Sequence, residues 1–174
     1  MRTFISIDIP KEIQEKIGKI QDSLPEFIGK KIELENLHLT LKFLGEVDKK
    51  ILSKVKGKLK EIKFRKFEVK VDSIGVFSEE FVRIVWLRLC GIEKLQSEVD
   101  NALNELFEKE KRFMSHLTIA RVKQVKNKKN FLSELNEIKF DKLKFVVENF
   151  KLKRSVLYEK GPSYEDIFIY NAIE

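Results

Sequence analysis

The chain has 174 residues, of which 43% are hydrophobic and 36% carry a charge, and its formal net charge is +7. These values indicate a packed globular protein and exclude a disordered chain. The single cysteine excludes an internal disulfide and a zinc site of several thiolates, and no apolar stretch approaches the length of a membrane span. The basic excess favours a polyanionic partner, nucleic acid first, although a surface rich in Lys and Glu is also typical of heat-adapted proteins.

Strands and helices alternate in the first half of the chain. The first apolar run is too short for a signal peptide, so we expect a cytoplasmic protein. Apolar residues recur at four- and three-residue steps in two segments, which predicts amphipathic helices that begin at Asp8 or Pro10 and at Asp48. In chain order we predict a strand at residues 2–9, a helix with Ile13, Ile17, Ile20 and Leu24 on its apolar face, an extended piece at 31–34, a strand at 37–44, a helix with Ile51, Val55, Leu59 and Ile62 on its apolar face, and a strand at 67–76.

The second half repeats this order. In chain order we predict a strand at 81–89, a break at Gly91, a helix whose apolar face holds Ile92, Leu95, Val99, Leu103 and Leu106, a strand at 115–122, a helix at 130–138, a long strand at 142–157, a turn at Gly161-Pro162 and a strand at 167–172. Because the order of elements occurs twice, we expect an internal duplication folded about a pseudo-twofold axis. The prediction is a single α+β domain of residues 1–174 with two similar lobes, near 1–77 and 78–174, whose terminal segments are free to cross between lobes.

One four-residue pattern, a histidine followed by Leu, Thr and an apolar residue, occurs once in each half. The copies are His38-Leu39-Thr40-Leu41 and His116-Leu117-Thr118-Ile119, and they contain the only two histidines of the chain. Side chains alternate between the faces of a strand, so each His shares a face with its Thr while the apolar residues enter the core. Two such strands placed side by side would line a cleft with two imidazoles and two hydroxyls.

This set of side chains suits proton transfer at a phosphate. An imidazole has an ordinary pKa of about 6.5, so one histidine can accept a proton while the other donates one near neutral pH. A Thr hydroxyl on the same face can donate a hydrogen bond to a phosphoryl oxygen. Arg121, just beyond the second motif, also suits phosphate, but strict alternation places it opposite His116 unless a bulge intervenes. The same alternation places Lys42 on the face of His38 and Thr40.

Other classes of catalytic site find little support in the sequence. Two histidines without a neighbouring cluster of Cys, Asp or Glu fall short of a three-ligand zinc site. The chain has no nucleophile-elbow motif of a serine hydrolase and no glycine-rich phosphate loop of the P-loop type. We therefore expect an acid–base pair that uses no metal.

The paired motifs resemble those of the two-histidine phosphoesterase superfamily, and the chain is similar in particular to its RNA 2',3'-cyclic phosphodiesterases, first described as 2'-5' RNA ligases. The stretches that carry the resemblance span essentially the whole chain and are residues 2–8, 35–45, 74–77, 83–86, 113–122, 152–155 and 161–164. Many members have Pro before the second histidine, where this chain has Ser115. The resemblance implies two α+β lobes, each an antiparallel sheet backed by helices, with the active cleft between them.

The activity implied by the resemblance is hydrolysis of a 2',3'-cyclic phosphate at an RNA end, such as that of a tRNA fragment, to a 2'-phosphate. It implies a monomer without metal or cofactor, with His38 as proton donor, His116 as proton acceptor, and substrate-binding roles for Thr40, Thr118 and Arg121. The residues themselves do not say which histidine is the acid. The same site would also allow a 5'-hydroxyl RNA end to attack and form a 2'-5' bond.

Two other functions stay open at this point. One is a phosphodiesterase for a small cyclic-phosphate nucleotide, and the other is a non-catalytic RNA-binding module with incidental histidines. A further prediction concerns the basic run at residues 121–129, which follows the second motif. We expect it to contact the RNA backbone, the alternative being a solvated loop and helix start.

Overall fold

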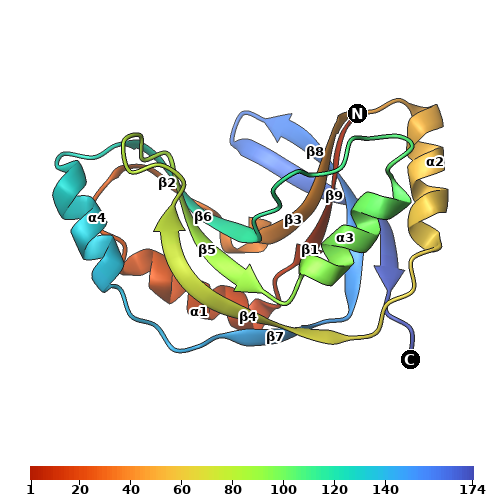
Figure 1. The fold of residues 1–174 in the computed structure, drawn as a ribbon. Helices are drawn as coiled ribbons and strands as arrows, with labels where there is room; N and C mark the ends of the chain where they lie inside the picture. The colour runs from red at the N-terminus through yellow and green to blue at the C-terminus, as the bar shows by residue number, and fades with distance from the viewer.

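Helices and strands alternate along the chain much as the sequence predicts (Figure 1). The structure is a computed structural model that describes all residues, 1–174. Its elements, in chain order, are β1 (Arg2–Asp8), α1 (Lys11–Asp22), β2 (Ile28–Lys31), the 3-10 turn η1 (Leu34–Asn36), β3 (His38–Glu46), α2 (Lys49–Lys60), β4 (Phe67–Val76), β5 (Ile84–Cys90), α3 (Glu93–Ala102), β6 (His116–Gln124), α4 (Lys128–Glu137), β7 (Lys144–Val147), β8 (Asn149–Tyr158) and β9 (Gly161–Asn171).

The strands form two antiparallel sheets. One has the strand order β3-β1-β8-β9 and the other has the order β2-β6-β5-β4-β7. We call them the His38 sheet and the His116 sheet, after the residue that begins β3 and the residue that begins β6. β3 and β6 contact each other where the two sheets meet (Figure 1). The predicted α+β class, with antiparallel sheets backed by helices, is confirmed.

Each sheet takes strands from both halves of the sequence. β2 and β4 belong to the His116 sheet, whereas β8 and β9 belong to the His38 sheet. The helices cross in the same way: α1, which follows β1, packs beside β6, and α3, which follows β5, packs beside β3. α2 lies next to α3 and β9, and α4 lies next to β4. Each motif strand is therefore supported by a helix from the other half of the chain.

Burial along the two motif strands follows the predicted alternation. The apolar motif residues are at most 1% exposed, whereas the histidines and threonines between them are partly exposed. The core also contains part of the predicted apolar faces of α1 and α2, and the remaining residues of these faces are partly buried against it. Asp48 caps α2, as predicted, because its side chain accepts a hydrogen bond from the backbone N–H of Ile51 at 2.8 Å. No helix has the length and apolar character needed to cross a membrane.

Three predicted boundaries are wrong. The extended piece lies earlier, because β2 pairs with β6 at Ile28–Lys31 and the chain then turns at η1. The strand predicted at 142–157 is two strands, since β7 pairs with β4 in the His116 sheet while β8 enters the His38 sheet. β9 begins at Gly161 because a tight hairpin joins it to β8, and Gly161 has a φ of 125° there. An apolar run does not reveal which sheet a strand joins.

Candidate active site

The two motif strands begin with their histidines and contact each other at the boundary between the sheets. β3 starts at His38 and β6 at His116, and each histidine is on the same partly exposed face of its strand as Thr40 or Thr118. The pairs of residues predicted from the two motifs therefore lie on neighbouring strands of different sheets.

A β-bulge places Arg121 on the same face of β6 as His116. In the pairing of β6 with β5, Ile119 is an extra residue with no partner. Such a residue reverses the alternation of side chains beyond it. Ala120 is accordingly buried and Arg121 is exposed. Strict alternation would place Arg121 on the face opposite His116. Because of the bulge, the Arg121 side chain lies on the same face as His116 and Thr118.

β3 contains the matching bulge, at Leu41, and the prediction for Lys42 is wrong for this reason. Beyond the bulge, Lys42 enters the core and is 3% exposed instead of sharing the histidine face. Its Nζ forms an ion pair with Asp100 of α3 and donates a hydrogen bond to a backbone carbonyl in the loop after α3. The position that corresponds to Arg121 holds Phe43, which is 50% exposed.

Each histidine ring is held by an equivalent hydrogen bond, from Nδ1 to the backbone carbonyl two residues earlier. Nδ1 of His38 lies 2.7 Å from the carbonyl oxygen of Asn36, and Nδ1 of His116 lies 2.9 Å from that of Met114. A carbonyl oxygen only accepts hydrogen bonds, so Nδ1 is the protonated nitrogen in both rings. In this tautomer, a ring that carries a single proton keeps the lone pair of Nε2 free to accept another.

Aromatic rings pack against both imidazoles. Tyr164 of β9 lies edge-on to His38, with 4.9 Å between the ring centroids, and Phe77, just after β4, lies edge-on to His116 at 4.8 Å. Phe4 of β1 also contacts His38, at 5.1 Å. These contacts and the hydrogen bonds to Nδ1 restrict the orientation of both rings, which is what a preorganised proton-transfer site needs.

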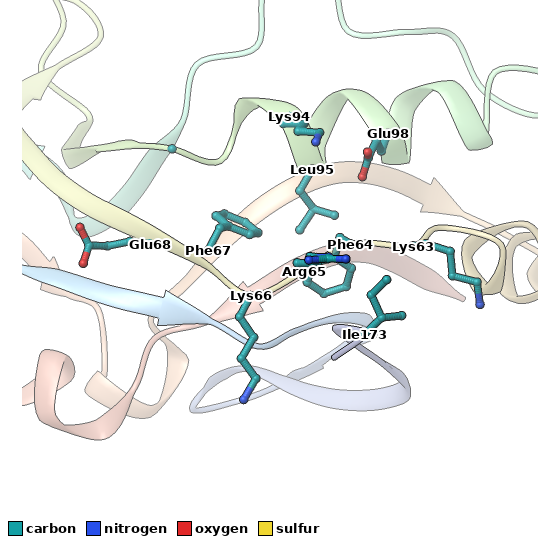
Figure 2. Close-up of a pocket in the computed structure, with 11 residues that line it drawn as sticks. Lys63, Phe64, Arg65, Lys66, Phe67, Glu68, Lys94, Leu95, Glu98 and Ile173 are labelled. Carbon is teal, nitrogen blue, oxygen red and sulfur yellow. The ribbon is translucent and has the colours of Figure 1, made fainter.

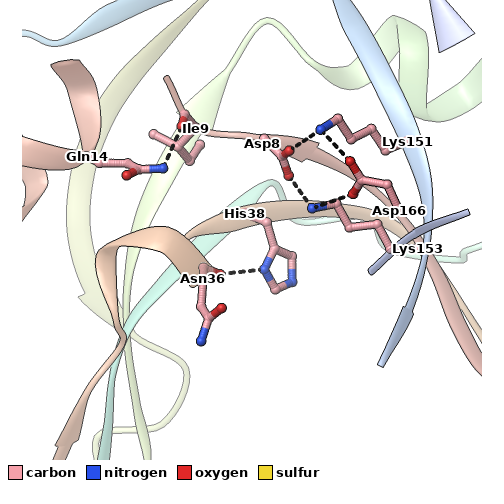
Figure 3. Close-up of polar contacts among 8 residues, drawn as sticks. All are labelled: Asp8, Ile9, Gln14, Asn36, His38, Lys151, Lys153 and Asp166. Carbon is pink, nitrogen blue, oxygen red and sulfur yellow. Dashed lines mark hydrogen bonds and ion pairs between the residues drawn. The ribbon is translucent and has the colours of Figure 1, made fainter. Parts of the chain in front are cut away.

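Four charged side chains form a cluster beside His38 (Figure 3). Lys151 and Lys153 of β8 each pair with Asp8 of β1 and with Asp166 of β9, at N···O distances from 2.6 to 3.3 Å. Burial alone would raise the pKa of Asp8, but hydrogen bonds from the two lysines outweigh burial and lower it. The carboxylate of Asp8 therefore stays ionised and compensates charge on both ammonium groups.

The surroundings of His38 lower its pKa below the ordinary value of 6.5. Burial of the ring is the largest cause, and the positive charges of Lys153 and Arg121 act in the same direction. The hydrogen bond to Asn36 and the negative charge of Asp8 act in the opposite direction. The ring of His38 is therefore neutral at neutral pH in the free protein. The influence of Arg121 also means that its guanidinium, from the other sheet, lies within electrostatic reach of His38.

The charged cluster and Tyr164 were not among the predicted site residues. They come to His38 through the long-range pairing of β8 with β1 and β9, which local periodicity does not reveal. One signal was present in the sequence: Lys151 and Lys153 alternate with apolar residues, so they share one face of a strand.

The surface has two notable hollows, of which only one borders the histidine site. One, of about 760 Å³, lies between the β2–η1 segment and the β8–β9 hairpin, and its lining includes Asn36, which holds His38. The other, of about 460 Å³, shares no residue with the histidine site (Figure 2). It is lined by the α2–β4 segment, α3 and the C-terminal end, including Phe64, Arg65, Leu95 and Ile173. No group of three or more His, Cys, Asp or Glu side chains is placed to hold a metal ion.

Comparisons with known proteins match the sequence and the fold over almost the whole chain. The family model of the LigT-like phosphoesterases matches residues 7–86 and 90–164. The RNA 2',3'-cyclic phosphodiesterase of Methanocaldococcus jannaschii is 36% identical over 172 residues, which cover 96% of this chain and 98% of that protein. The crystal structure of TT0787 from Thermus thermophilus has a TM-score of 0.80 at 25% identity, covering 98% of this chain and 97% of that one. Escherichia coli LigT complexed with 3'-AMP has a TM-score of 0.78 at 23% identity, covering 99% and 98%. The chain therefore belongs to the family of LigT-like phosphoesterases.

Proposed function

We propose that this phosphoesterase hydrolyses a 2',3'-cyclic phosphate at the end of an RNA to a 2'-phosphate. The observation that carries the proposal is the matched presentation of His38 and His116. Each ring donates a hydrogen bond from Nδ1 to a backbone carbonyl, and the two strands that carry the rings contact each other. The activity named for the Methanocaldococcus jannaschii relative supports the choice of substrate.

In the proposed reaction the cyclic phosphate binds between the two rings. Nε2 of His116 accepts a proton from a water molecule, whose oxygen attacks the phosphorus. The bond between phosphorus and the 3'-oxygen breaks, and His38 donates a proton to the departing 3'-oxygen. The product carries a 2'-phosphate and a 3'-hydroxyl, and proton exchange with solvent restores both rings. Proton transfer by two imidazoles requires no metal or cofactor.

Thr40, Thr118 and Arg121 hold the phosphate in this proposal. The two hydroxyls would donate to its non-bridging oxygens, and the guanidinium would add a charge-assisted hydrogen bond. The position of Arg121 supports this role, because the bulge at Ile119 puts its side chain on the face of His116.

The role of His38 as the acid requires that the ring gain a proton when substrate binds. Its pKa is lowered in the free protein, chiefly by burial, so the ring is neutral there at neutral pH. A bound phosphate is an anion, and a negative charge beside an imidazole raises its pKa. Substrate would therefore bring His38 into its acid form, and proton uptake on binding is part of the proposal.

The same site would join two RNA ends if a 5'-hydroxyl replaced the attacking water. Water is present at about 55 M, so a scarce RNA end competes only when binding supplies a high effective molarity. Hydrolysis is therefore the proposed reaction, and 2'-5' ligation is a side reaction with suitable ends in vitro.

The test compares two substrates with two variants. A dinucleotide and a tRNA-length RNA, each ending in 2',3'-cyclic phosphate, are assayed for hydrolysis with the wild type, His38→Ala and His116→Ala. We expect turnover of both substrates by the wild type alone, with a higher kcat/KM for the RNA. Equal kcat/KM values would favour a small cyclic nucleotide as the substrate. RNA binding without turnover by the wild type would favour a non-catalytic RNA-binding module.

A further inference from the structure

We infer that Gln21 of α1 is a positioning residue for Arg121, because its side-chain amide holds the bulge that turns Arg121 toward the site. The inference rests on the phosphate-binding role proposed for Arg121. It names a residue from the other half of the chain, outside both motifs and outside the segment that carries Arg121.

The contacts of Gln21 converge on the bulged residue. Its Nε2 donates hydrogen bonds to the carbonyl oxygens of Ile119 and Ile32, both at 2.9 Å. The carbonyl of Ile119 also accepts from the backbone N–H of Ile32 at 2.9 Å. Gln21 is 4% exposed and its bond to Ile119 is buried, so loss of the amide would remove one of the two donors that hold this carbonyl in the interior. The amide thus ties the bulge in β6 to the end of β2.

The bulge decides which way Arg121 points. Ile119 is the extra residue in the pairing of β6 with β5, and both Ile119 and Ala120 are completely buried. Without the extra residue, alternation would turn Ala120 outward and bury Arg121. A change that loosens the carbonyl of Ile119 therefore acts on the guanidinium at the end of the motif, although Gln21 belongs to a different element.

The other motif strand has a corresponding arrangement. Its bulge is at Leu41, and the next residue, Lys42, is held by Asp100 of α3. Beside each motif strand, a buried polar side chain on the crossing helix contacts the strand at or next to its bulge. The two helices therefore do more than fill the core, since each one makes a buried polar contact with a motif strand from the other half of the sequence.

The test is a double-mutant cycle with Gln21→Leu and Arg121→Ala, assayed on a 2',3'-cyclic phosphate dinucleotide. Gln21→Leu should lower kcat/KM about tenfold, since directly coupled positions interact on this scale. In the Arg121→Ala background the same change should have no further effect, because the guanidinium that it displaces is already absent. Gln21→Met is the second variant, because it keeps a straight side chain of similar size without a donor.

The matched control is Gln96→Leu. Gln96 lies on α3 and is 6% exposed, and its Nε2 has no hydrogen-bond partner. The control removes a buried glutamine amide from the other crossing helix, and it should leave kcat/KM within about twofold of the wild type. Melting curves of all variants show whether the chains are folded at the assay temperature.

The outcomes separate the inference from the function on which it rests. Loss of activity in folded Gln21→Leu that disappears in the Arg121→Ala background supports the positioning role. Full activity in Gln21→Leu or Gln21→Met, or losses that multiply with that of Arg121→Ala, would overturn it. Normal activity of Arg121→Ala itself would instead remove the proposed phosphate-binding role.

Discussion

Asp8 lies directly opposite His38 in the antiparallel pairing of β1 with β3, and its carboxylate is bound by Lys151 and Lys153. The environment of the histidine therefore depends on a charge balance that spans three strands. Asp8 raises the pKa of His38, while burial, which is the largest influence, and Lys153 lower it. Loss of the carboxylate would leave the lysine charges less compensated beside the ring.

The first prediction concerns the pH dependence of Asp8→Asn. The substitution removes a charge that raises the pKa of His38, so that pKa should fall further below its ordinary value. If His38 is the acid, activity needs its protonated form, which is present below the pKa and lost as the pH rises through it. The alkaline limb of kcat/KM should therefore move to lower pH.

Asp166→Asn is the control for this shift. It removes the same charge from the same pair of lysines, but Asp166 lies on β9, whereas Asp8 lies directly opposite His38 in the pairing of β1 with β3. Its pH profile should move less than that of Asp8→Asn. An unmoved alkaline limb in Asp8→Asn, or a shift confined to the acid limb, would argue against His38 as the acid.

The second prediction concerns the two histidines themselves. Replacing either His38 or His116 with Ala should lower kcat by about 10²–10⁴-fold, the usual contribution of one general acid or base. Both rings are partly exposed at the start of a strand, so the variants should stay folded. The measurement is kcat on a cyclic-phosphate dinucleotide together with a melting curve. Nearly normal turnover in either folded variant would exclude the acid–base pair.

The elements that follow a regular pattern were predictable from the sequence. The periodic apolar residues of α1 and α2 gave boundaries that agree with the structure within a few residues, and the strand predicted at 67–76 is β4. The two motifs indicated which strands carry the histidines, because alternation needs only local sequence. The features that the sequence predicts correctly are therefore those that depend only on neighbouring residues in the chain.

The parts that failed depend on partners distant in sequence. The extra residues Leu41 in β3 and Ile119 in β6 each reverse the alternation just beyond them, which places Lys42 in the core and Arg121 on the motif face. No local pattern indicates that Asp100 pairs with Lys42 from a helix of the other half. The pairing of β8 with β1 likewise brings the charged side chains beside His38, and no local sequence pattern predicts this pairing.

The third prediction concerns the stability of the buried pair between Lys42 and Asp100, whose side chains are 2% and 8% exposed. Lys42→Met leaves a buried carboxylate without its cation and should lower the free energy of unfolding by about 3–5 kcal/mol. Adding Asp100→Asn should recover much of this loss, because the neutral amide still offers an oxygen to the backbone N–H of Glu110. Urea unfolding of the two variants checks this. If Lys42→Met alone were as stable as the wild type, the ion pair would not contribute to holding β3 against α3.

The fourth prediction concerns the basic run that follows the second motif. Lys126 and Lys128 contact acidic or carbonyl groups only at the surface, and Lys129 is exposed. If the run follows the RNA backbone, changing these three lysines to Gln should weaken binding of long RNA. The slope of log K against log salt should fall by about 0.7 for each phosphate of a single strand that the variant no longer neutralises. Turnover of a cyclic-phosphate mononucleotide should be unchanged.

The matched control replaces three lysines of α2, Lys49, Lys50 and Lys54, with Gln; all three are exposed. It changes the net charge by the same amount on a helix of the other sheet, so it separates a local contact from a general charge effect. Equal salt slopes for the two triple variants would assign the basic run to a solvated loop and helix start.

The most direct test of the proposed function is the identity of the product formed from an RNA that ends in 2',3'-cyclic phosphate. The wild-type protein is incubated with this RNA, and the 2'-phosphate and 3'-phosphate ends are resolved, with His38→Ala and His116→Ala as controls. We expect only the 2'-phosphate, formed by the wild type and not by either variant at a comparable rate. A 3'-phosphate product, or an unchanged cyclic phosphate, would contradict the proposed cleavage of the bond between phosphorus and the 3'-oxygen.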